Sequence, residues 1–98
     1  MRDISQKVST LRTAVAKAVL RVSPSTIEQI KNNTLPKGNP LEVAKVAAIQ
    51  AAKNTSQIIP YCHPLPVDYV GVEFHLDEDC IVIKVTVKAI YKTGVEME

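Results

Sequence analysis

The 98-residue sequence predicts a single α+β domain over residues 1–98, with helices packed against an antiparallel β-hairpin. Two segments in the second half alternate apolar and polar side chains, as half-buried strands do. Two earlier segments begin with residues that cap helices and continue with apolar residues at helical spacing. These patterns indicate a sheet that buries one face under helices.

The predicted hairpin comprises residues 70–76 and 80–91, joined by a turn at Asp77-Glu78-Asp79. In both strands the apolar side chains fall on one face and the polar ones, such as Glu73, His75 and Lys84, on the other. The expected buried face consists of Val70, Val72, Phe74, Leu76, Ile81, Ile83, Val85, Val87 and Ala89.

Residues 11–22 fit two structures. Apolar residues at positions 11, 14, 15, 18, 19 and 22 form a helical stripe, whereas positions 14, 16, 18, 20 and 22 alternate as in a strand. Helical spacing is the stronger pattern, but the β-branched residues favour a strand. The residues alone leave both structures open. The polar residues 1–10 are expected to form an arm or a first strand.

Two helix starts are clear in the sequence. Ser23 can cap a short helix that begins with Pro24 and ends near Asn32-Asn33. Asn39 can cap a second helix that begins with Pro40 and extends to about Asn54. This second helix is apolar on most sides, so we expect it to pack on the sheet with one side and on another subunit with the other.

Composition narrows the class of protein. A net charge of +2 is too small to favour nucleic acid or a membrane surface as a partner. One Phe and no Trp predict a small aliphatic core, which favours oligomerisation. With neither a signal peptide nor a transmembrane segment apparent, we expect a cytoplasmic protein whose Cys62 and Cys80 are free thiols.

The segment Ile59-Pro60-Tyr61-Cys62-His63-Pro64-Leu65-Pro66 is the best candidate site. Its prolines disfavour a helix and stiffen the loop, which presents a thiol beside an imidazole. Histidine is the side chain that most often acts as a general acid or base, so His63 is a candidate for that role. Cys62 fits a functional thiol or a buried small apolar residue equally well. The spacing does not predict a metal site, because only His75 and Cys80 could add ligands, and no cofactor is expected.

Several charged residues are candidate site residues, but each also has an ordinary structural explanation. Lys37-Gly38 precedes a helix N-terminus, which suits an anion, although a loop lysine is usually just solvated. Lys53, expected in the last turn of its helix, is equally well explained by the helix dipole. Arg12 is consistent with a phosphate-binding residue or with an ordinary surface residue. Glu96 and Glu98 are consistent with a functional site or with a solvated terminal pair of charges.

Taken in order, these motifs resemble the molybdenum cofactor biosynthesis protein C family, the cyclic pyranopterin monophosphate synthases. The resemblance covers essentially the whole chain. The matching segments are Asp3-Ile4-Ser5, Lys7, Thr10-x-Arg12, Lys37-Gly38, Ala51-Ala52-Lys53-x-Thr55, Ile59-Pro60-x-Cys62-His63-Pro64-Leu65 and Lys92-Thr93-Gly94-Val95-Glu96-Met97-Glu98. Tyr61 and Asn39 depart from the leucine and aspartate usual in the family.

The resemblance implies a ferredoxin-like fold with an antiparallel sheet and helices on one face, here in the order strand, helices, strand, strand. It therefore assigns residues 11–22 to a strand. It also implies a hexamer, a trimer of dimers, that converts a cyclic dihydroguanosine triphosphate to cyclic pyranopterin monophosphate and diphosphate. By similarity, the catalytic residues are Lys37, Lys53 and His63, and the substrate-binding residues are Arg12, Tyr61, Cys62, His63, Met97 and Glu98.

The family's motif at residues 94–98 continues into a long helix and a further strand, which carry a catalytic aspartate and a lysine. A chain that ends at Glu98 is therefore expected to be truncated and to leave one sheet face partly bare. The alternative to an enzyme is a non-catalytic oligomerising or nucleotide-binding fragment of the same family.

Overall fold

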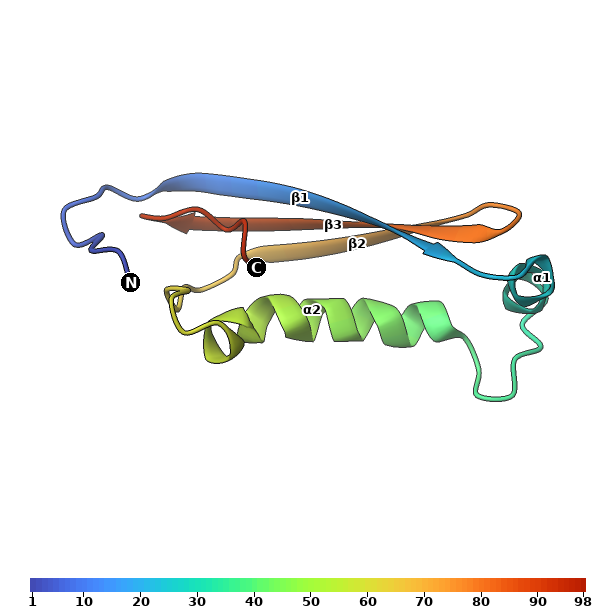
Figure 1. The fold of residues 1–98 in the computed structure, drawn as a ribbon. Coiled ribbons are helices and arrows are strands. Elements are labelled where there is room, and N and C mark those ends of the chain that lie inside the picture. The colour runs from blue at the N-terminus through green and yellow to red at the C-terminus, as the bar shows by residue number, and fades with distance from the viewer.

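In the computed structural model, which describes all of residues 1–98, three strands form one antiparallel sheet and the longer helix lies along one face of it (Figure 1). The sheet order is β1-β3-β2, so the last strand is the central one. This arrangement confirms the α+β prediction and the order strand, helices, strand, strand. The elements are β1 (Thr10–Arg21), α1 (Pro24–Lys31), α2 (Pro40–Ile58), β2 (Tyr69–Leu76) and β3 (Cys80–Tyr91).

Residues 10–21 form a strand along their whole length, which settles the ambiguity of this segment. The register pairs Ala14 with Val87 and Ala16 with Val85, so the alternating alanines share a face with the apolar side of the hairpin. The helical stripe in the sequence is overridden because a strand here satisfies the free edge of β3. The preceding residues 1–9 form an arm and not a strand, with Ile4 buried.

The predicted cap of the first helix is confirmed. The Ser23 side chain accepts a hydrogen bond from the backbone N–H of Thr26 at 3.3 Å, and Pro24 occupies the first turn. The helix ends at Lys31, and Asn33 follows with a φ of 55°, a left-handed conformation that asparagine tolerates. Ile27 is the buried residue of this helix.

The second helix begins as predicted but is longer than expected. The Asn39 side chain accepts a hydrogen bond from the Leu41 N–H at 3.0 Å. The helix continues past Asn54, and the Thr55 hydroxyl donates to the Ala51 carbonyl at 2.7 Å, which satisfies the buried polar side chain. It ends at Ile58, since Ile59 precedes a proline and is extended.

The longer helix changes the interpretation of Lys53. The last turn of α2 contains no basic residue, so the explanation of Lys53 as a favourable charge at the helix C-terminus is wrong. Neither helix is long and apolar enough to cross a membrane.

The core is thin and lies toward one end of the sheet. Ala52 of α2, Val87 and Ala89 of β3, and Val95 form its buried centre. The radius of gyration is 16.5 Å, against roughly 13 Å for a compact chain of this length. Helix α2 packs mainly on β2, and an apolar groove remains between α2 and β1. Part of the helix-side face is therefore uncovered.

We expect Val95→Ala to lower the free energy of unfolding by about 2 kcal/mol, because the lost methyl groups leave a cavity in the core. Val95 is only 2% exposed. Val8→Ala is the matched control, since Val8 is 75% exposed and should change stability by less than about 0.5 kcal/mol. Urea denaturation of both variants compares them. Equal losses would contradict the central position assigned to Val95.

Candidate functional site

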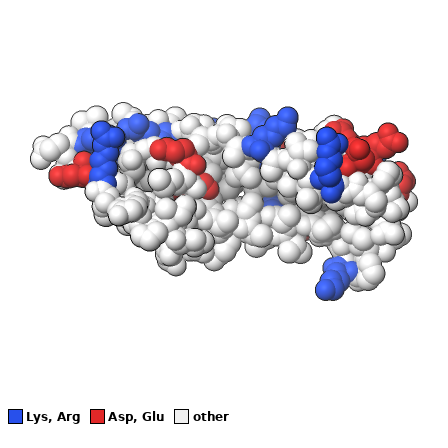
Figure 2. All heavy atoms as spheres, in the orientation of Figure 1, with Lys and Arg blue, Asp and Glu red and all other residues white.

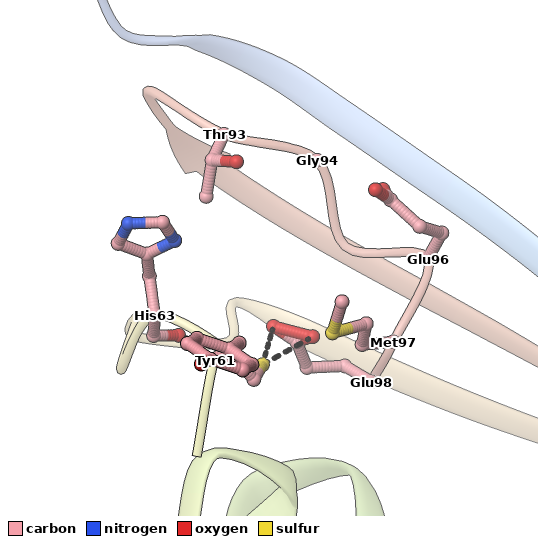
Figure 3. A pocket seen from close by; sticks show the side chains of 8 residues that line it. Tyr61, His63, Thr93, Gly94, Glu96, Met97 and Glu98 are labelled. Atoms are coloured by element: carbon pink, nitrogen blue, oxygen red, sulfur yellow. Dashed lines mark hydrogen bonds between the residues drawn. The ribbon is translucent and has the colours of Figure 1, made fainter. Parts of the chain in front are cut away.

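The proline loop meets the last residues of the chain at one end of the sheet. Helix α2 and strand β3 both end there, so the segments that follow them, residues 59–66 and 92–98, lie against each other (Figure 1). Buried Val95 fixes the second segment to the core. The pocket between the segments is lined by Tyr61, Cys62, His63, Thr93, Gly94, Glu96, Met97 and Glu98 (Figure 3).

The loop itself has the local structure that its prolines favour. It contains no strand and continues no helix. A turn closed by the hydrogen bond from the Cys62 N–H to the Ile59 carbonyl at 3.0 Å places Pro60 and Tyr61 at its centre. This turn buries Cys62 and leaves Tyr61 exposed. The adjacent thiol and phenol thus point into different surroundings.

A polar contact in the pocket joins Cys62 to Glu98. The thiol lies 3.6 and 3.7 Å from the two carboxylate oxygens of Glu98 (Figure 3) and 3.7 Å from the His63 carbonyl oxygen, and these acceptors share its single hydrogen. Burial raises the pKa of Cys62, and the negative charge of Glu98 raises it further. Burial also raises the pKa of Glu98. The thiol is therefore held protonated as a donor, which does not suit a nucleophile.

His63 is oriented by the N-terminal arm. Its Nε2 lies 2.7 Å from the backbone carbonyl oxygen of Arg2. Because a carbonyl only accepts hydrogen bonds, Nε2 carries the hydrogen, and Nδ1 of the neutral ring is left as an acceptor. A second hollow on this side of the ring is lined by the arm together with Tyr91 and Lys92. His63 therefore lies between two surface hollows.

Arg12 lies on the same face of the sheet as the core. It pairs across the sheet with Ala89, which packs on Val95. Its Nε is buried and has no hydrogen-bond partner. A buried donor left without a partner costs about 1–3 kcal/mol, so this nitrogen would favour a bound acceptor. Arg12 is thus more than a solvated surface residue.

The two candidate lysines lie apart from this pocket within one chain. Lys37 is exposed in the turn before α2, at the opposite end of a helix about 28 Å long. It lines a separate hollow with Pro36, Gly38 and Asn39. Lys53 is exposed on α2 and lines neither hollow. The structure therefore gathers Tyr61, Cys62, His63, Met97 and Glu98, but not Lys37 or Lys53.

Two neighbours of His63 were not singled out from the sequence as site residues. The Arg2 carbonyl is a backbone group with no side-chain signal, so no pattern could have indicated it. Lys92 lines the hollow beside His63, as does Asp3. Hydrogen bonds from Ser5 are the main cause of the lowered pKa of Asp3, and the charge of Lys92 also lowers it. For Lys92, the position directly before Thr93-Gly94 was the signal available in the sequence. No cluster of three or more His, Cys, Asp or Glu side chains could hold a metal ion.

The pocket is small and open at its rim. Its volume is about 40 Å³, whereas sites for small molecules usually occupy roughly 300–1,000 Å³. Tyr61 and Met97 are 71% and 51% exposed at its edge. A ligand of nucleotide size would therefore lie across the rim, with only one group inside the pocket.

Comparison with known proteins gives a consistent result along the whole sequence. The model of the MoaC family matches residues 1–98. A probable cyclic pyranopterin monophosphate synthase from Sulfurisphaera tokodaii is 49% identical over 96 residues, which cover 98% of this chain and 64% of the relative. The cyclic pyranopterin monophosphate synthase of Staphylococcus aureus strain MRSA252 is 50% identical over 103 residues, covering 100% and 63%.

A third relative, the cyclic pyranopterin monophosphate synthase of Aquifex aeolicus, is 44% identical over 96 residues, covering 98% of this chain and 38% of the relative. The chain thus spans less than two thirds of the length of these three relatives.

We expect Glu98→Gln to make Cys62 react several-fold faster with iodoacetamide at a fixed, mildly alkaline pH. Removing the charge of Glu98 removes a cause that raises the pKa of Cys62, so more of the thiol ionises. The rates should be measured in a Cys80→Ser background, so that only Cys62 reacts. Glu96→Gln is the control, because Glu96 raises this pKa less than Glu98 does and makes no hydrogen bond to the thiol. An unchanged rate in Glu98→Gln would contradict the contact.

Proposed function

The chain belongs to the MoaC family, and we propose that it acts in molybdenum cofactor biosynthesis as a cyclic pyranopterin monophosphate synthase. The proposed reaction converts (8S)-3′,8-cyclo-7,8-dihydroguanosine 5′-triphosphate to cyclic pyranopterin monophosphate and diphosphate. One observation carries the proposal. Cys62-His63 and Met97-Glu98 are distant in the sequence, and the family resemblance assigns substrate binding to both segments, which line a single pocket.

The triphosphate of such a substrate needs cations and hydrogen-bond donors. Arg12 supplies a buried Nε that has no partner within the chain. A phosphate oxygen would satisfy this donor and would gain a charge-assisted hydrogen bond. We assign Arg12 to substrate binding, and Lys37 and Lys53 to the stabilisation of the charge that develops on the departing diphosphate.

Forming a cyclic phosphate also needs a proton acceptor. A sugar hydroxyl attacks the α-phosphorus, the bond to the diphosphate breaks, and the hydroxyl loses its proton. His63 is suited to accept that proton at Nδ1, because the Arg2 carbonyl holds the hydrogen on Nε2. The protonated ring can return the proton during the ring opening and closure that build the pyranopterin.

The remaining pocket residues are assigned to binding the ring system. Tyr61 and Met97 stand at the rim, where their exposed side chains can cover a planar heterocycle. The Glu98 carboxylate can accept a hydrogen bond from a ring N–H, and burial raises its pKa. Cys62 fixes the position of the Glu98 carboxylate from the buried side.

A homo-oligomer is part of the proposal, because the pocket of one chain is small and lacks both lysines. We propose a hexamer built as a trimer of dimers, acting in the cytoplasm. Lys37 and Lys53 lie about 20 Å apart along α2, so one chain cannot bring both to the same phosphate through that helix. A neighbouring copy would supply one of them.

The test of the reaction uses a chimaera. Residues 1–98 replace the matching part of the Sulfurisphaera tokodaii relative, which supplies the rest of that protein's length. We expect the chimaera to form cyclic pyranopterin monophosphate and diphosphate from the cyclic triphosphate. The 98-residue chain alone should be slower by about 10²-fold or more, because it matches only 64% of that relative's length. A chimaera that binds substrate without turnover would favour the alternative, a nucleotide-binding fragment.

We expect His63→Ala in the chimaera to keep the melting temperature and the oligomer size but to lose about 10²–10⁴-fold in kcat. His75→Ala is the matched control, because His75 is exposed on the hairpin and pairs only with Asp77 at 2.8 Å. It should retain full turnover. A His63→Ala enzyme with normal kcat would show that another group accepts the proton.

We expect Lys37→Ala and Lys53→Ala chimaeras, each inactive alone, to regain turnover when they are mixed, unfolded and refolded together. If the two lysines serve one site from different copies, a mixed pair contains one site with both lysines intact. The control mixes Lys37→Ala with the double variant, which cannot restore Lys37 anywhere. Recovery in neither mixture would place the two lysines in one copy or in separate roles.

A further inference from the structure

Helix α2 has a second apolar face that nothing in the chain covers. Opposite the side that contacts the sheet, Val43 and Val46 are 69% and 67% exposed. With Ala47 and Gln50 they line a shallow hollow on the outer side of the helix. In the view of Figure 2 the charged side chains lie mainly along the strands, and the visible side of α2 is mostly uncharged. Two exposed valines side by side on one helix are unusual for a solvated surface.

Two opposite charges flank this face on the same edge of the helix. Glu42 lies in the first turn and Lys53 lies eleven positions later, which is about three full turns and roughly 16 Å. Both side chains are exposed, and the ion pairs of the chain are Arg21–Asp79 and His75–Asp77, so neither has a partner within it. The midpoint between them falls beside Ala47, whose small side chain lines the same outer hollow and allows close helix approach.

We propose that this face, defined by Glu42, Val43, Val46, Gln50 and Lys53, is an interface at which α2 packs antiparallel on α2 of a second copy. The inference rests on the proposed homo-oligomer and assigns its contact surface. In an antiparallel pair related by a two-fold axis, equal edges of the two helices face each other. With the axis near Ala47, Glu42 of each copy meets Lys53 of the other.

The charge pattern is what favours a second copy as the occupant. Glu42 and Lys53 lie at equal distances on either side of the centre of the helix face. Two-fold rotation therefore places the acid of each copy opposite the base of the other, which gives two opposite-charge contacts. The valines between them would be buried together. The pairing also brings Lys53 of one copy to the N-terminal end of α2 in the other, close to the loop that carries Lys37.

The test is charge reversal followed by mixing. Sedimentation velocity over a dilution series should show self-association of the 98-residue chain. Glu42→Lys alone and Lys53→Glu alone should each weaken it by about tenfold, because each places two like-charged pairs across the interface. An equimolar mixture of the two variants should associate as tightly as the original chain, since the mixed pair restores both opposite-charge contacts.

The mixing experiment distinguishes the loss of contacts across the interface from destabilisation of the helix itself. Glu42→Lys also puts a cation at the N-terminus of α2, which weakens the helix by itself, but that effect would not be cured by a second variant. Lys31→Glu is the control, because Lys31 is an exposed charge on α1, outside this face, and its reversal should leave association unchanged. Absence of self-association, or no recovery on mixing, would overturn the inference. Neither result depends on substrate or turnover.

Discussion

Strand β3 is hydrogen-bonded along both edges, and the rest of the molecule takes its position from that strand. Its pairing with β1 and β2 sets which side chains face the helix. Its end delivers the last seven residues to the proline loop. Asp68 marks the limit of the sheet on this side, because its carboxylate accepts a hydrogen bond from the Ile90 N–H at 2.7 Å. The pocket lies where sheet pairing stops.

Local chemistry made several parts of the fold predictable. Ser23 and Asn39 act through atoms two or three residues away, so their caps could be read directly from the sequence. The hairpin was predictable from the alternation of apolar and polar side chains, because each face of a strand lies in one kind of environment. Residues 11–22 were different, because an Ala- and Val-rich stretch satisfies helical and strand spacing together. Only the partner strand, some seventy residues later, decides between them.

The candidate site was predictable as a set of residues and not as a geometry. Cys62 and His63 were conspicuous because prolines surround them, and the resemblance added Met97 and Glu98. The contact of Cys62 with Glu98 spans 36 positions, and that of His63 with Arg2 spans 61. No local rule sets contacts over such separations. The end of α2 was also misplaced, because the helix continues to Ile58, just before the extended residue that precedes Pro60.

The orientation of His63 depends on a main-chain oxygen, and every amino acid possesses that atom. Replacing Arg2 by any other residue therefore leaves the acceptor in place. A survey of side-chain replacements across the arm would report position 2 as tolerant, and a comparison of related sequences would show it free to vary. Removing the arm, or redirecting its backbone with a proline, would free the imidazole at once. Genetic tolerance at this position would thus coexist with a strict structural requirement.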